Sequence, residues 1–250
     1  MEAGGFRRSP GEGMGAMNDR ELRDRLEALS EPGYQKFASA LIPSVPQEKI
    51  LGVRLPKLRA LARELAADDW RAYLRCARCD TFEEVMLQGL VISGLEEEPG
   101  TVLSYAGSFI PKIDNWSVCD AFCAGFRLAR THPDAVWGFI QPYLRDDREY
   151  GVRFGAVMLL SYFADRRHAS EAFRLLDEAH CEGYYARMAV AWAVSALFAA
   201  LPERTFRYLG RSSLDDFTYR KALQKILESR QTGAEYREQI KTMRSHVSEP

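Results

Sequence analysis

The stretch "YGVRFG", from Tyr150 to Gly155, decides the fold because related blocks recur along the chain. The other blocks are "FEEVML", "WSVCDA", "YYARMA" and "FTYRKA". The aromatic residues that begin the blocks follow one another at steps of 34, 34, 34 and 33 residues; they are Phe82, Trp116, Tyr150, Tyr184 and Phe217. A fixed period of this size is typical of repeat proteins built from helix pairs.

Helical periodicity fills the repeats. Apolar residues recur at i, i+3, i+4 and i+7 in almost every segment, as in "LPKLRALAREL" from Leu55 to Leu65, and strand signals are nearly absent. One helix pair cannot bury its own apolar face, so successive pairs must stack. The sequence therefore predicts an all-α fold, an α-solenoid of HEAT-like helix pairs with a period of about 34 residues.

Composition bounds the domain and its partners. The chain has 250 residues, of which 46% are hydrophobic and 28% charged, and its net charge is -1. A nucleic-acid partner would therefore need a local basic surface. We expect residues 1–17 to form a disordered extension, residues 18–246 to form a single HEAT-like repeat domain, and residues 247–250 to form a frayed tail.

Several classes of protein and site are disfavoured. The chain has no apolar run long enough for a membrane span, and its start has no apolar core of a secretory signal. The five cysteines fit a reduced, cytoplasmic location. Two pairs, Cys76 with Cys79 and Cys119 with Cys123, have spacings that zinc sites use, but both fall in expected helices, where cysteine usually packs as a small hydrophobe. We expect neither a metal nor a cofactor.

Three arginines occupy equivalent positions in successive repeats: Arg153, Arg187 and Arg220. A row of guanidinium groups along one surface of a solenoid suits a phosphate backbone, and Lys221 extends the row. The alternative is a set of ion pairs between repeats. The two interpretations are about equal for any single arginine, and the set favours phosphate. The repeating aromatic residues themselves are expected mainly to pack against neighbouring repeats.

Asp120 breaks the repeat pattern. It lies four residues after its aromatic residue, Trp116, and so shares a helix face with that indole. The equivalent positions elsewhere hold no acid; they are Met86, Phe154, Met188 and Lys221. An acid beside a cationic surface is a functional candidate, although an acid in a first helical turn is also stabilised by the helix dipole. Trp192 lies eight residues after Tyr184 and therefore on the same face; it is either a core residue or an exposed indole.

The segments "DNWSVCD", "YGVRFGAVMLL" and "YYARMAVAW" resemble the HEAT-like DNA alkylation repair proteins, the AlkD-type DNA glycosylases, over roughly residues 20–230. The resemblance implies a monomer that excises cationic alkylated purines, such as 3-methyladenine or 7-methylguanine, from duplex DNA without base flipping. It implies Asp120 as the catalytic residue, with Trp116, Trp192 and Arg153 against the substrate. Arg187, Arg220 and Lys221 would hold the DNA backbone, and the protein would be nucleoid-associated when bound.

A second function stays open. The segment from Gly33 to Arg54 is interrupted by Pro43 and Pro46, so its helix should stop near Ile42. A solenoid that lacks a long N-terminal helix also suits a non-catalytic module that binds unusual or branched DNA, or a protein partner. The glycosylase hypothesis requires the carboxylate of Asp120 to be accessible and not taken up by a neighbouring guanidinium.

Overall fold

The computed structural model describes residues 19–245, so the expected extension at 1–17 and the tail at 247–250 lie outside the described residues. Every regular element in the described range is a helix. The chain starts with α1 (Asp19–Leu29) and α2 (Pro32–Leu41). What we call the inner layer consists of α3 (Leu55–Ala67), α5 (Phe82–Gly94), α7 (Trp116–Ala124), α10 (Glu149–Tyr162), α12 (Tyr184–Ala200) and α14 (Asp216–Glu228). The outer layer consists of α4 (Trp70–Cys76), α6 (Pro99–Phe109), α8 (Leu128–Thr131), α9 (Pro133–Ile140), α11 (Ala169–Asp177), α13 (Pro202–Leu209) and α15 (Ala234–Ser245).

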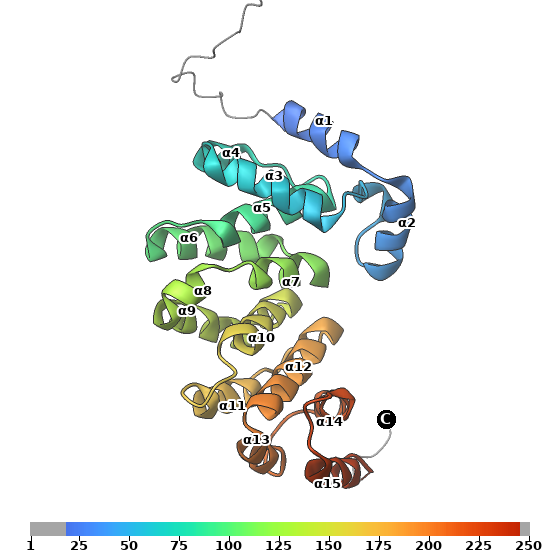
Figure 1. Ribbon diagram of the computed structural model, residues 1–250, viewed down its shortest axis with the longest axis vertical. Coiled ribbons are helices and arrows are strands. Elements are labelled where there is room, and N and C mark those ends of the chain that lie inside the picture. Colours follow the sequence, from blue (N-terminus) through green and yellow to red (C-terminus); the bar gives the residue numbers. More distant parts are fainter. Residues whose placement is uncertain (1–18, 246–250) are drawn as a thin grey trace, which may run out of the picture.

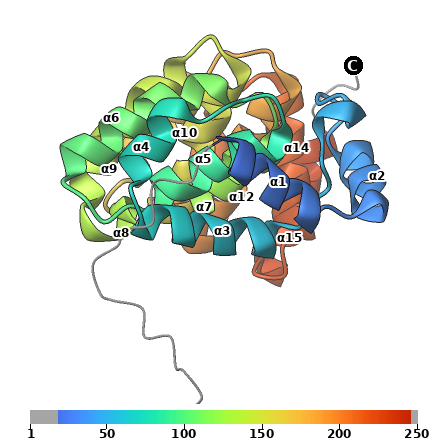
Figure 2. The same cartoon turned by 90° about the horizontal axis from the view of Figure 1, so that it is seen from above.

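Consecutive inner helices pack against one another from α3 to α14, and the outer helices cover one side of that stack. Figure 1 shows the rising stack, with α6, α9, α11 and α13 along one edge and α2 near the other. Viewed from above, α2 stands apart from the outer helices α6 and α9 (Figure 2). The all-α solenoid predicted from the sequence is confirmed. None of the helices within residues 19–245 combines the length and apolarity that a membrane span needs.

The repeating aromatic residues mark the starts of inner helices. Phe82, Trp116 and Tyr184 are the first residues of α5, α7 and α12, and Tyr150 and Phe217 are second in α10 and α14. Polar residues cap several of these starts: the side chains of Thr81, Asn115 and Asp215 each accept a backbone N–H from the first turn of their helix. The period in the sequence is therefore the spacing of one helix start to the next.

Aromatic side chains join the two layers in the middle of the stack. Phe122 of α7 is fully buried. Its ring centroid lies 4.9 Å from that of Phe109 on α6, 5.3 Å from Phe126 and 5.8 Å from Phe154 on α10. Edge-on and offset contacts of this kind add to the free energy of burying the rings. Helix α7, which carries Asp120, is thus packed against both α6 and α10.

A buried carboxylate holds the loop that leads into α3. Glu83 is completely buried, and its oxygens accept the backbone N–H groups of Leu51 at 2.9 Å, Gly52 at 2.8 Å and Val53 at 3.1 Å. Gly52 has φ of +90°, and an added Cβ would lie 2.7 Å from the carbonyl oxygen of Glu31. Only glycine suits this position, so the loop takes one conformation and presents three donors to one acid.

We predict that Glu83→Gln lowers the free energy of unfolding by about 2–4 kcal/mol, because the amide replaces a charged acceptor and turns an N–H group toward backbone donors. Urea unfolding followed by circular dichroism measures this. The matched control is Glu238→Gln, whose exposed side chain pairs with Lys241 on the surface. Equal unfolding midpoints for the two variants would contradict the role given to Glu83.

Candidate nucleic-acid interface

The N-terminal ends of α7, α10, α12 and α14 lie side by side, and we call this surface the N-terminal edge. Ring contacts connect it: Tyr150 lies 6.0 Å from Tyr185, Tyr185 lies 5.2 Å from Tyr184, and Tyr184 lies 5.9 Å from Phe217. No side chain caps the first turn of α10 or α12 from the N-cap position. At α12 the backbone N–H of Tyr185 donates to Oε1 of Glu149 at 2.6 Å, so a carboxylate of the protein already occupies that helix start. The N–H groups and the dipole at the start of α10 are attractive to anions.

Asp120 and Arg153 form a bidentate ion pair at this edge. Nε of Arg153 donates to Oδ1 of Asp120 at 2.9 Å and Nη2 donates to Oδ2 at 2.7 Å. Nη1 of Arg153 donates to the carbonyl oxygen of Tyr185 at 3.0 Å. Burial disfavours the charged guanidinium, but the hydrogen bonds and negative charge of Asp120 outweigh it and raise the pKa of Arg153. Arg153 therefore stays charged and ties α10 to both α7 and α12.

This pairing differs from the arrangement expected from the sequence. The sequence predicts separate roles for the two residues, Asp120 as the catalytic group and Arg153 as a contact to the substrate. In the structure their side chains are instead hydrogen-bonded to each other. The side chain of Arg153 is 8% exposed and that of Asp120 is 24% exposed. A carboxylate offers about four lone-pair sites, and a bidentate guanidinium uses two of them. Asp120 therefore keeps acceptor capacity on its exposed side, although it is not the unpartnered acid that the glycosylase hypothesis required.

Trp116 lies one turn before Asp120 and contacts the N-terminal segment. Its indole Nε1 donates to the carbonyl oxygen of Leu41, the last residue of α2, at 3.0 Å. The helix stops there as the prolines predicted. The loop that follows α2 also reaches α10, since Ser44 hydrogen-bonds Tyr150, whose pKa burial raises to about 12. The end of α2 and its loop therefore border Trp116 on one side.

Trp192 of α12 is the exposed indole, with 42% of its surface accessible. Nζ of Lys225 lies 5.9 Å from its ring centroid. Lys225 was missed in the sequence, although its place four residues after Lys221 puts both lysines on one face of α14. Of the two alternatives for Trp192, the structure shows the exposed indole and excludes the core position.

The remaining arginines of the row are also engaged. Nη1 of Arg187 lies 3.7 Å from Oδ1 of Asp215, and its guanidinium lies 4.4 Å from the ring centroid of Phe217. Nζ of Lys221 lies 5.7 Å from the same ring, and Arg220 precedes it on α14. The ion-pair alternative thus describes Arg153 and Arg187 in this structure. Contact of Arg187, Arg220 and Lys221 with a DNA backbone stays a prediction.

The cysteine pairs do not form a metal centre among residues 19–245, where no group of three or more suitable ligands converges. Cys119 and Cys123 are buried in α7. Burial raises the pKa of the Cys123 thiol well above its usual range, so it packs as a neutral, apolar group.

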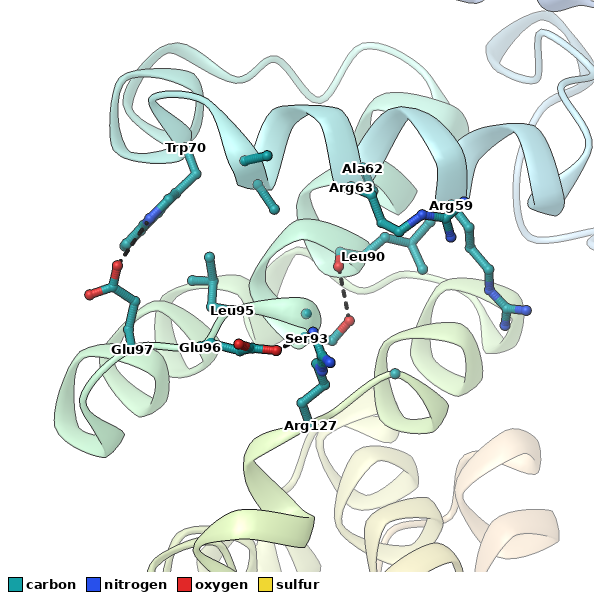
Figure 3. A pocket seen from close by; sticks show the side chains of 14 residues that line it. Arg59, Ala62, Arg63, Trp70, Leu90, Ser93, Leu95, Glu96, Glu97 and Arg127 are labelled. Carbon is teal, nitrogen blue, oxygen red and sulfur yellow. Dashed lines mark hydrogen bonds and ion pairs between the residues drawn. The ribbon is translucent and has the colours of Figure 1, made fainter.

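A separate cavity of about 510 Å³ lies between α3, the end of α5 and the segment after α7 (Figure 3). Two polar contacts lie within its wall: Nε1 of Trp70 donates to Glu97 at 3.3 Å, and Arg127 pairs with Glu96 at 2.5 Å. None of the side chains predicted for the active site lines this cavity.

The comparison with protein families follows the fold and the site. No relative among curated proteins matches the chain. The model of the family described as "DNA alkylation repair enzyme" matches residues 22–226, which includes Trp116, Asp120, Arg153 and Trp192. Because this match spans most of the chain, the protein belongs to the DNA alkylation repair enzyme family and has a role in DNA alkylation repair.

Proposed function

We propose that the protein is a monofunctional DNA glycosylase that excises cationic alkylated purines, of the 3-methyladenine and 7-methylguanine type, from duplex DNA without base flipping. The observation that carries the proposal is the oriented carboxylate of Asp120, partly exposed at the N-terminal edge and fixed by Arg153. The family match supports repair of alkylated DNA as its setting. The protein acts as a cytoplasmic monomer that joins the nucleoid when it binds DNA.

For this reaction, a fixed negative charge near the deoxyribose matters more than a strong base. When the N-glycosyl bond of a cationic purine breaks, the base takes the bonding electrons and becomes neutral, while positive charge develops on the deoxyribose. A fixed carboxylate stabilises that charge more in the transition state than in the ground state. Water then adds to the anomeric carbon and releases a proton. Arg153 keeps Asp120 oriented, and the lone pairs that Arg153 leaves free face the sugar or the water.

The two indoles come from different inner helices: Trp116 shares α7 with Asp120, and Trp192 lies on α12. The exposed ring of Trp192 stacks on the sugar or the lesion, where its π face attracts cationic charge. Trp116 is oriented by its hydrogen bond to Leu41. The uncapped start of α10, together with Lys221 and Lys225, attracts the phosphates that flank the lesion.

A specific observation also favours the second candidate, a non-catalytic module that binds unusual or branched DNA or a protein partner. Both oxygens of Asp120 already accept hydrogen bonds, and the Asp120–Arg153 pair joins successive repeats as a purely structural tie would. Under this function Asp120 has no substrate to act on. The two functions differ in whether methylated purines are released from DNA.

We predict that Asp120→Asn lowers the rate of release of 7-methylguanine from alkylated duplex DNA by about 10²–10⁴-fold, the range for losing a group that stabilises transition-state charge. Affinity for the duplex should stay equal or rise, because a negative charge near phosphates is removed. The control is Asp134→Asn, an exposed acid that pairs with Arg167 on the outer layer. Release by the Asp120 variant at the parent rate would contradict the catalytic role given to Asp120, whereas no release by the parent protein would support the non-catalytic module.

Loss of the carboxylate also leaves Arg153 nearly buried without its charge partner, which destabilises the fold. A second variant avoids this cost. Trp192→Ala should change the unfolding free energy by less than about 0.5 kcal/mol because the ring is exposed. It should slow base release at least about tenfold under single-turnover conditions, the loss of about 1.4 kcal/mol expected from one stacking contact. Trp192→Phe, which keeps an aromatic face, should recover most of the rate; equal rates for the alanine variant and the parent would exclude stacking.

A further inference from the structure

A second concentration of positive charge lies on the outer layer. A cavity of about 520 Å³ opens between α11 and α13, and we call it the outer basic pocket; its polar wall includes Ser170, Arg174, Arg204, Arg207 and Arg211. Figure 1 places α11 and α13 along the edge of the stack opposite α2. The pocket shares no residue with the N-terminal edge.

Three of these arginines carry charge that no carboxylate within residues 19–245 neutralises through a direct ion pair: Arg204, Arg207 and Arg211. Nη1 of Arg204 donates to the carbonyl oxygen of Arg166 at 3.0 Å, and Nη2 donates to Oγ of Ser170 at 2.8 Å. Both partners are neutral, so they orient the guanidinium without cancelling its charge. Arg207 donates only a long bond of 3.4 Å to the carbonyl oxygen of Glu203, and its side chain and that of Arg211 are exposed.

The carboxylates near the pocket are committed elsewhere. Oδ1 of Asp177 accepts the hydroxyl of Tyr208 at 2.8 Å and the backbone N–H of Ser213 at 3.1 Å. Glu171 and Glu178 both pair with Arg174, which therefore contributes no free charge. Both donors to Asp177 are neutral, so its negative charge offsets that of one arginine. The pocket keeps an excess of positive charge from Arg204, Arg207 and Arg211.

The chemistry of the wall favours phosphate over a peptide carboxylate. The rings of Phe173 and Tyr208 stack with centroids 4.4 Å apart, but only 9% and 3% of these residues is exposed, so the pocket has no apolar socket for a side-chain anchor. What it offers is guanidinium groups, whose planar forks match phosphate oxygens, and the hydroxyl of Ser170. Contacts of this kind are independent of sequence and typical of DNA backbone binding.

We propose that the outer basic pocket binds the phosphate backbone of a second DNA segment. The two layers of helices separate it from the N-terminal edge, so a straight duplex held at one surface does not reach the other. One chain would then hold two duplex segments at once. The proposal uses the family role in DNA repair and goes beyond base excision, on which it does not depend.

The test is the number of short duplexes bound per chain. An unmodified 12-base-pair duplex is titrated at low salt against the full chain, and the stoichiometry is measured by sedimentation velocity. We expect two duplexes on the parent and one on Arg207→Ala/Arg211→Ala. The control, Arg75→Ala/Arg244→Ala, removes the same charge from exposed positions on α4 and α15 and should still bind two. Melting temperatures of both variants should match the parent, since neither change removes an ion pair given above.

Salt dependence identifies the contact. On the parent, the second duplex should bind with a slope of log K against log salt of at least about -2, because two or more phosphate contacts contribute about 0.9 each. One duplex on the parent, or two on the pocket variant, would overturn the proposal. Competition by an acidic peptide that is lost in the pocket variant, with DNA stoichiometry unchanged, would assign the pocket to a protein partner instead. Base release from methylated duplex is measured on the same variants and should be unchanged, so failure of the glycosylase proposal is seen separately.

Discussion

The ion pair between Asp120 and Arg153 is the constraint on which the candidate site depends. Arg153 is almost fully enclosed, and an enclosed guanidinium without a counter-charge costs several kcal/mol, on the order of 3–5. Its third contact, to the carbonyl oxygen of Tyr185, brings in α12. One arginine therefore sets the relative positions of three inner helices, and the acid that we propose as the catalytic group is also the acid that allows that arginine to be buried.

The protein has a net charge of -1, and the local pairing of its acids explains how it still presents surfaces suited to DNA. Positive potential comes from geometry as well as from composition: helix starts gathered at one edge add partial charges that no count of lysine and arginine includes. The acids are largely tied up in local pairs, as Asp120 is with Arg153 and Glu171 with Arg174. The remaining charge is concentrated where side chains lack an acidic neighbour.

Much of the fold was accessible from the sequence because the repeat is a local signal. The 34-residue step located the inner helices, and Pro43 located the end of α2. The pairing of Asp120 with Arg153 had a weaker signal: Arg153 follows Asp120 by nearly one period, so the two occupy almost the same register on adjacent helices. Register does not give the distance between helices, and the choice between phosphate and ion pair stayed open. Glu83 was unpredictable for another reason, since a glutamate in a first helical turn looks like an ordinary dipole partner until a distant loop is placed over it.

That glutamate has a consequence for access to the site. Glu83 accepts hydrogen bonds from the loop that connects the N-terminal helices to the stack. At the other end of the same segment, the carbonyl oxygen of Leu41 accepts a hydrogen bond from the indole of Trp116. The segment is thus held at two points, by Glu83 deep in the protein and by Trp116 at the candidate site. Movement of the loop at Glu83 would be transmitted along α2 to Trp116. The stiffness of this loop therefore determines how firmly the end of α2 is held beside the candidate site.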